Sequence, residues 1–296
     1  MELKEELKKY QNIVEEELRK YVIKEEVPER LLNASMEYSL LAGGKRLRPI
    51  LMIATYELFK SNYEKCFPYA VALEMLHNFS LIHDDLPAID NDDFRHGKPT
   101  NHKQFNEHTA ILAGDGLMNT AYLVISKDLL NEKDEELKKK KIMAFNEIAY
   151  AIDRMIAGEF VDTEYEGKPI LEENLEYMHK NKTGAVLRAS VRVGAILGGA
   201  SEEELEKLTV YAEKIGLAFQ VKDDILSEEG DEKITGKPVG NDRERNKCTY
   251  VSKYGLDKSK EILEKIITES KESISSFGEK AEFLRILANY IKDRNK

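Results

Sequence analysis

The sequence contains no tryptophan, only two cysteines and only seven prolines among its 296 residues. Cys66 and Cys248 are isolated and form no CxxC pair, so we expect neither a disulfide framework nor a zinc site. Isolated thiols are typical of a protein that works in a reducing cytoplasm, where we expect this one. Because prolines are few, long stretches can form helices without interruption.

The sequence also lacks the features of a membrane or nucleic-acid protein. No uncharged run approaches the roughly 18 residues that a membrane-spanning helix requires. Residues 1–21 alternate acidic and basic side chains and have no apolar signal-peptide core. The formal net charge of −10 argues against general affinity for nucleic acid or for anionic membranes. We therefore expect a soluble globular protein.

Sustained alternation of polar and apolar residues is missing, so β-strands are improbable. Apolar residues instead recur every three or four positions, which predicts helices nearly everywhere. No linker rich in Gly, Ser or Pro divides the chain, and no repeat of fixed period is visible. We predict one all-α domain over residues 1–296. The helices are expected at roughly 5–23, 31–41, 49–60, 66–85, 107–127, 136–157, 171–198, 202–226, 256–273 and 278–293.

Two groups of carboxylates stand out, each where an apolar helix meets polar sequence. The first acidic cluster consists of Asp84, Asp85, Asp90, Asp92 and Asp93, and the second of Asp223 and Asp224. Such crowding is repulsive unless something positive lies among the carboxylates. Their positions suggest the mouth of a largely apolar cavity.

Helical spacing places other polar side chains beside these carboxylates. Asp84 shares a helix face with Ser80 and His77, which precede it by four and seven residues. Asp90 follows a break at Pro87 and can fold back beside Asp84. In the second cluster, Gln220 precedes the two aspartates by three and four residues and shares their face.

Carboxylates without histidine or cysteine partners suit a hard cation, above all Mg²⁺. For either cluster alone, a pair of solvated helix ends explains the pattern equally well. A calcium loop of the EF-hand type is excluded: counted from Asp90, glycine comes at position eight instead of six, and position five is Phe94.

Basic residues beside glycines favour the metal interpretation. They are Lys45, Arg46 and Arg48 in GGKRLRP (43–49), Lys182 with Thr183 in NKTG (181–184), and Lys237 in TGKP (235–238). Metal-binding carboxylates combined with scattered Lys and Arg are what diphosphate binding requires. None of these stretches is a Walker P-loop.

Several motifs in this order resemble the trans-polyprenyl diphosphate synthases, the family that includes farnesyl and geranylgeranyl diphosphate synthases. The matching stretches are GGKRLRP (43–49), HNFSLIHDDLPAIDNDDFRHGKPTNH (77–102), LAGDGL (112–117), HKNKTG (179–184), FQVKDDIL (219–226), GKPVGND (236–242) and KCTY (247–250). The resemblance implies an all-helical bundle around a deep apolar pocket, a homodimer, and three Mg²⁺ per site.

The resemblance also implies roles for individual residues. Metal would be bound by Asp84, Asp90 and Asp223, with Asp85 and Asp224 among the catalytic residues. The allylic diphosphate or its metal shell would be held by Arg95, Lys182, Thr183, Gln220 and Lys237. Isopentenyl diphosphate would be held by Gly44, Lys45, Arg48 and His77, with His96 at a further position of that subsite. From periodicity alone, His77 would be an ordinary packed histidine.

The implied reaction condenses isopentenyl diphosphate with dimethylallyl or geranyl diphosphate. Phe79 and Ser80, five and four residues before Asp84, would limit chain length. An aromatic ring at Phe79 favours farnesyl diphosphate as the product, and geranylgeranyl diphosphate is the alternative product. Phe79 could also be an ordinary core residue with no role in chain length.

Three positions depart from the family pattern. His96 replaces a usual arginine, and its anionic neighbours are expected to favour the charged form, so that isopentenyl diphosphate binding weakens as pH rises. Ser227 replaces a usual third aspartate, for which Glu228, Glu229 and Asp231 are the candidate replacements. Glu159 stands where glutamine is common, which is unhelpful unless it faces metal or Lys182. A terpene cyclase or a non-catalytic paralogue subunit therefore remain alternatives.

Overall fold

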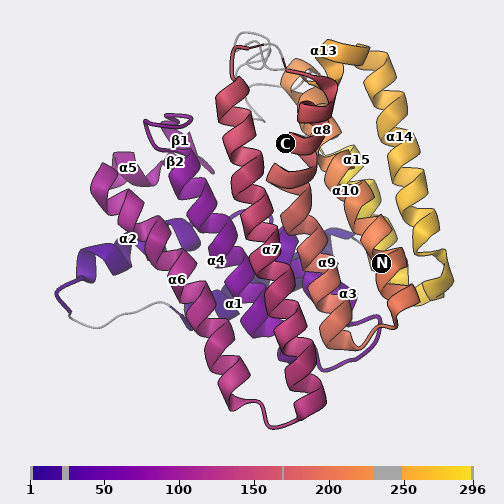
Figure 1. Cartoon of the computed structure of the whole chain (residues 1–296), viewed down its shortest axis with the longest axis horizontal. Coiled ribbons are helices and arrows are strands. Elements are labelled where there is room, and N and C mark those ends of the chain that lie inside the picture. The colour runs from indigo at the N-terminus through magenta and orange to yellow at the C-terminus, as the bar shows by residue number, and fades with distance from the viewer. Residues whose placement is uncertain (1–2, 22–26, 169, 230–248, 295–296) are drawn as a thin grey trace. The chain divides into compact units, whose positions relative to one another are not determined.

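The computed structural model describes residues 3–21, 27–168, 170–229 and 249–294. Most of these residues are helical, which confirms the all-α prediction (Figure 1). The contacts divide the chain into two compact units, residues 1–53 with 61–145 and residues 54–60 with 146–296. The single domain over residues 1–296 stays a prediction.

The first unit is built around α4 (Phe67–Asp84). This helix is apolar around most of its circumference, and Tyr69, Leu73 and Leu76 are fully buried. Pro68 lies in its first turn, where no intrahelical hydrogen bond is lost. α6 packs along α4 (Figure 1). The other elements are α1 (Leu3–Arg19), α2 (Arg30–Leu40), most of α3 (Leu47–Tyr56), η1 (Tyr63–Cys66), α5 (Asn101–Gln104), α6 (Glu107–Asn131) and the start of α7 (Glu135–Tyr165).

A short β-hairpin corrects the expectation that strands are improbable. β1 (Phe94–Arg95) pairs antiparallel with β2 (Lys98–Pro99). His96 and Gly97 form the two-residue turn, with φ of 52° and 76°. Two positive φ angles match the twist that tight hairpins favour. Strands of two residues are too short to show alternation, so periodicity could not reveal them.

The second unit surrounds α10 (Glu202–Glu229), whose apolar stripe includes Leu208, Tyr211, Ala212 and Ile215 at helical spacing. α9 and α14 both pack against α10 (Figure 1). The other elements are the end of α7, α8 (Glu172–His179), η2 (Lys180–Gly184), α9 (Ala185–Gly198), α13 (Tyr250–Tyr254), α14 (Leu256–Ser273), η3 (Ser275–Ala281) and α15 (Glu282–Asp293).

The described helices were also compared with the requirements of a membrane span. None of them is both long enough and apolar enough to cross a bilayer.

Candidate active site

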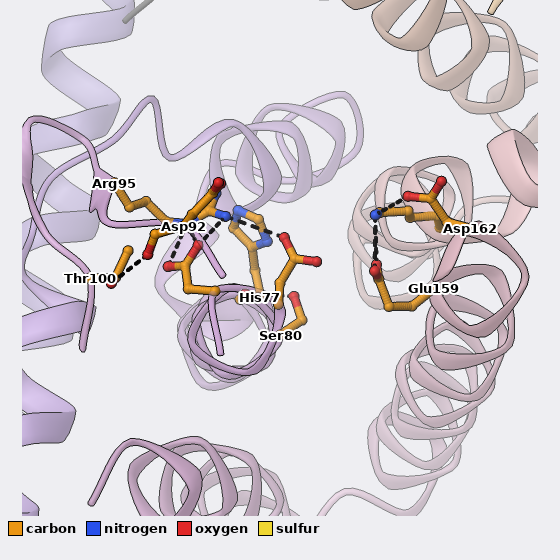
Figure 2. Close-up of polar contacts among 10 residues, drawn as sticks. His77, Ser80, Asp92, Arg95, Thr100, Glu159 and Asp162 are labelled. Atoms are coloured by element: carbon orange, nitrogen blue, oxygen red, sulfur yellow. Dashed lines mark hydrogen bonds and ion pairs between the residues drawn. The ribbon is translucent and has the colours of Figure 1, made fainter. Parts of the chain in front are cut away.

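The first acidic cluster lies at the end of α4 and in the turn that follows. The backbone N–H of Asp90 donates to the carbonyl of Asp84 at 2.9 Å, so the chain folds back as predicted. Thr100 closes the turn: its hydroxyl donates to the carbonyl of Asp92 at 2.8 Å, and its N–H to that of Asp93 at 3.0 Å (Figure 2). These bonds hold the backbone that carries the carboxylates.

Arg95, on β1, binds the two carboxylates that end α4 (Figure 2). Its Nε donates to both oxygens of Asp85 at 2.9 and 2.8 Å, and its terminal nitrogen reaches Asp84 at 3.2 Å. Burial raises the pKa of Asp85, and Arg95 opposes this shift. The exposed fraction of the side chain is 3% for Asp85 and 15% for Asp84. Asp84 is thus the more accessible of the two.

His77 lies on α4 among cations. Burial lowers its pKa well below 6.5, and the charges of Arg48, Arg95 and Arg46 lower it further. The imidazole is therefore neutral at pH 7. The Nε of Arg48 is buried and has no hydrogen-bond partner among the described residues. A neutral histidine between arginines is suited to hydrogen-bond an anion.

His96 belongs to the same group, but its expected charge state is wrong. A Cβ on Gly44 would lie 3.6 Å from its Nε2, so the ring packs beside the GGKRLR loop. Loss of solvation lowers the pKa of His96 below 6.5, and the charges of Arg95 and Arg46 lower it further. Cations, rather than the anionic neighbours that sequence suggested, dominate its surroundings.

Lys182 lies on a π-helical turn, η2, between α8 and α9. Such turns contain one extra residue and commonly occur at functional sites. Backbones approach this turn closely from both sides. A Cβ on Gly158 of α7 would lie 2.3 Å from the Lys182 backbone nitrogen, and one on Gly216 of α10 would lie 3.1 Å from Cα of Gly184. Glycine at these two positions therefore makes room for the turn.

Two carboxylates from α7 bind Lys182 (Figure 2). Its Nζ lies 2.6 Å from Asp162 and 2.9 Å from Glu159. Glu159, which stands where glutamine is common, thus faces Lys182, and this is one of the two conditions under which its charge was expected to be tolerated. One cation between two carboxylates leaves the group with a net negative charge.

The second acidic cluster lies near the end of α10. Asp224 is buried and accepts hydrogen bonds from Gln220 at 3.1 Å and from the backbone N–H of Tyr250 at 2.8 Å. The hydroxyl of Thr183 donates to Gln220 at 3.4 Å. Gln220 therefore links the π-helical turn to the second acidic cluster.

Asp223 has a partner that sequence reasoning missed. Arg294, immediately after α15, donates to its carboxylate at 2.5 Å and to the Phe219 carbonyl at 2.9 Å. The guanidinium also lies 3.9 Å from the centre of the Phe219 ring. Arg294 belongs to no motif, and only the fold brings it to Asp223.

Comparison with known proteins decides the family. Residues 29–284 match the model of the family described as Polyprenyl synthetase. The chain belongs to the polyprenyl synthetase family.

Individual proteins of known name are similar to this chain over most of its length. Farnesyl diphosphate synthase of Geobacillus stearothermophilus is 44% identical over 87% of this chain and 86% of its own. The chloroplastic geranylgeranyl pyrophosphate synthase of Catharanthus roseus is 45% identical over 89% and 74%. The structure of geranylgeranyl pyrophosphate synthetase from Pyrococcus horikoshii has a TM-score of 0.88 at 29% identity, with 99% and 100% of the chains covered. The resemblance to the prenyl synthases is confirmed.

Polyprenyl synthetases generally depend on Mg²⁺. Among the described residues, no three His, Cys, Asp or Glu side chains are grouped as a metal site. Mg²⁺ typically binds one or two carboxylates and takes its remaining oxygens from water and phosphate. The carboxylates of Asp84 and Asp90, on a backbone that folds back on itself, fit such a cation, and so does that of Asp223.

The structure leaves some predicted positions open. Lys237 and Asp231 lie outside the described residues, and Glu229 pairs with Lys260 at 2.7 Å. Phe79 is buried, with its ring edge-on to His83 at 5.7 Å. The hydroxyl of Ser80 donates to the His77 carbonyl at 2.8 Å.

Proposed function

We propose that this prenyltransferase condenses isopentenyl diphosphate with dimethylallyl or geranyl diphosphate and releases farnesyl diphosphate. The observation that carries the proposal is the group of cations around His77, next to the carboxylates that end α4. Cations and metal-binding carboxylates at one place suit diphosphates. Relatives named farnesyl and geranylgeranyl diphosphate synthases support the same chemistry.

Asp84, Asp90 and Asp223 would hold Mg²⁺, with three ions per site as the proposed number. When bound, Mg²⁺ neutralises charge on the departing diphosphate and makes it a better leaving group. Asp85 and Asp224 are the buried neighbours of these ligands in sequence. Their hydrogen bonds to other parts of the chain support a positioning role.

The cationic and polar residues divide between two diphosphates. The proposed partners of the allylic diphosphate are Arg95, Lys182, Thr183, Gln220 and Lys237, and those of isopentenyl diphosphate are Gly44, Lys45, Arg48, His77 and His96. At neutral pH the two histidines serve as neutral hydrogen-bonding groups, because each has a lowered pKa. Lys45 and Arg48 provide the permanent charge.

The reaction breaks the allylic C–O bond, and the released diphosphate takes the bonding electrons. The double bond of isopentenyl diphosphate then attacks the allylic carbon, and a proton is lost, which the released diphosphate accepts. Arg95 and Lys182 stabilise charge that grows on the leaving group. A deep apolar pocket would keep water from the carbocation.

Phe79 is the proposed limit on chain length. Its buried ring lies on α4, five residues before Asp84, or about 7.5 Å along a helix. We expect Phe79→Ala to lengthen the product beyond three isoprene units, as measured by chromatography of radiolabelled products. An unchanged product length would contradict this role.

A homodimer is also proposed. Ile111, Leu112 and Leu123 on α6 are 44%, 52% and 47% exposed. Their spacing places them on one side of the helix, where a second copy of the chain would cover them. Sedimentation equilibrium of the protein and of Leu112→Arg tests this, with a dimer expected for the first and a monomer for the second. The proposed location is the cytoplasm.

One incubation tests the proposed function. The protein is mixed with Mg²⁺, radiolabelled isopentenyl diphosphate and each allylic primer in turn, and the products are separated by chromatography. We expect labelled farnesyl diphosphate. Geranylgeranyl diphosphate would identify the alternative product. Cyclised hydrocarbon without incorporated label would indicate a cyclase, and no product a non-catalytic subunit.

A further inference from the structure

α1 (Leu3–Arg19) precedes the residues that match the family model. It is amphipathic: Tyr10, Val14 and Leu18 are buried, and the helix packs against α4. Two polar side chains, Gln11 and Glu15, lie one turn apart on the same side of the helix. α1 therefore brings both apolar and polar groups to the inside of the first unit.

Both polar side chains reach the GGKRLR loop. Nε2 of Gln11 donates to the backbone carbonyl of Lys45 at 3.3 Å. A carboxylate oxygen of Glu15 accepts a hydrogen bond from Nε of Arg46 at 2.7 Å. α1 thus contacts two consecutive residues of the loop that carries proposed ligands of isopentenyl diphosphate.

Arg46 differs from its neighbours in the loop, because its side chain is only 2% exposed and is used within the protein. Its guanidinium also donates to Glu74 of α4 at 2.8 Å and to the Leu40 carbonyl at 2.6 Å. Its φ of 50° is in the left-handed region, which is unfavourable for a residue with a side chain. These contacts hold the backbone between Lys45 and Arg48 in a conformation it would not otherwise prefer.

We propose that α1 positions the isopentenyl diphosphate subsite, with Gln11 and Glu15 as positioning residues that act through the backbone of Lys45 and the side chain of Arg46. This inference rests on the proposed function of the loop. Neither residue touches substrate in the proposal. A loop held in advance loses less conformational entropy when the anion binds.

The test measures KM for each substrate, kcat and thermal unfolding of the full chain. Glu15→Ala is expected to raise KM for isopentenyl diphosphate about five-fold while kcat and the allylic KM stay within about two-fold. Glu15→Gln, which keeps an acceptor oxygen, is expected to recover part of the loss. Gln11→Leu keeps α1 packed and should act in the same direction more weakly. Glu16→Ala, an exposed neighbour, is the matched control.

Lys45→Ala separates failure of this inference from failure of the proposed function. If Lys45→Ala raises KM for isopentenyl diphosphate but Glu15→Ala and Gln11→Leu do not, α1 has no positioning role. Equal changes in both KM values that follow the loss of thermal stability also overturn the inference. If Lys45→Ala leaves KM unchanged, the subsite itself is assigned wrongly.

Discussion

The two acidic clusters are alike in one respect and differ in another. In each, the first aspartate of the Asp-Asp pair is more exposed than the second: Asp84 and Asp223 are accessible, whereas Asp85 and Asp224 are buried. The buried member accepts hydrogen bonds that fix a neighbouring segment, the hairpin in one case and the start of α13 in the other. In each Asp-Asp pair, the first carboxylate is therefore the more accessible group, and the second supports the structure from inside.

The clusters differ in where their cations come from. Arg95 follows Asp85 by 10 residues, on the hairpin that comes next in the chain after α4 and the turn that carries Asp90. Arg294, the cation of the second cluster, follows Asp223 by 71 residues. The first cluster is assembled by local sequence, whereas the second requires the fold of its unit.

The largest expected effect separates the accessible from the buried aspartates. Asp84→Asn and Asp223→Asn should lower kcat by roughly 100- to 1,000-fold, because an oxygen ligand near the departing charge is weakened. The unfolding temperature of Asp84→Asn should barely change, because Asp85 keeps its hydrogen bonds to Arg95. Asp85→Asn should instead lower it by about 5 °C, because breaking a largely buried ion pair costs about 2 kcal/mol. Steady-state kinetics and calorimetry measure both effects.

The division would be disproved if Asp85→Asn abolished turnover at full thermal stability. Asp224→Asn gives the matching comparison in the second cluster, where the acceptor for the Tyr250 N–H is weakened. A fall in unfolding temperature larger than that of Asp223→Asn is expected there.

The next effect concerns the π-helical turn, which has no counterpart in the first cluster. Gly158→Ala would place a methyl group against the Lys182 backbone, so the turn must shift by about 1 Å, and kcat should fall by about 100-fold. Gly116→Ala is the control, because its added carbon meets only the flexible end of Met36. Equal kcat values for the two variants would show that the π-helical turn has no role in catalysis.

A smaller effect is expected at Glu159. Glu159→Gln removes one of the carboxylate charges that bind Lys182, so the ammonium is more available to a diphosphate, and the allylic KM should fall about three-fold. Glu164→Gln, on the same helix and with an exposed side chain that pairs with Lys168, is the control. A rise in allylic KM would mean that Glu159 supports binding.

The smallest effect concerns pH at His96. Because its pKa lies below 6.5, the wild-type imidazole is neutral above about pH 7 and gains charge only as pH falls. His96→Arg adds a permanent charge, so KM for isopentenyl diphosphate should fall about two-fold at pH 8 and the difference should shrink below pH 6. The surrounding charges are Arg95, Arg46, Lys45 and Glu74. A ratio that is constant across this pH range would contradict the assignment.

Helices and local contacts were predictable because both depend on neighbouring residues. The segment expected at 66–85 is α4 (Phe67–Asp84), and the return of Asp90 toward Asp84 followed from a proline between them. The hairpin was missed, since its strands are two residues long. The charge state expected for His96 was wrong because burial lowers its pKa, and Arg95 and the more distant Arg46 lower it further.

Contacts between distant segments could not be predicted from the sequence, for a different reason. The residues that neighbour Arg294 and Glu15 in the sequence do not distinguish these two side chains from exposed charges on other helices. Their partners, Asp223 and Arg46, are set by how whole helices pack. From the sequence, Glu159 was expected to be tolerated only if it faced metal or Lys182. The fold was needed to show that it does face Lys182.

The π-helical turn constrains which insertions and deletions this chain can accept. It contains one residue more than an α-helical turn would, so a deletion within Lys180–Gly184 could leave a continuous α-helix from α8 to α9. Every residue on one side of the deletion would then be rotated by about 100° relative to the other side. The shortened protein would be as helical as before, yet Lys182 would no longer face the carboxylates of α7 in the same way, nor Thr183 the Gln220 side chain of α10. At this turn, chain length itself is a functional property.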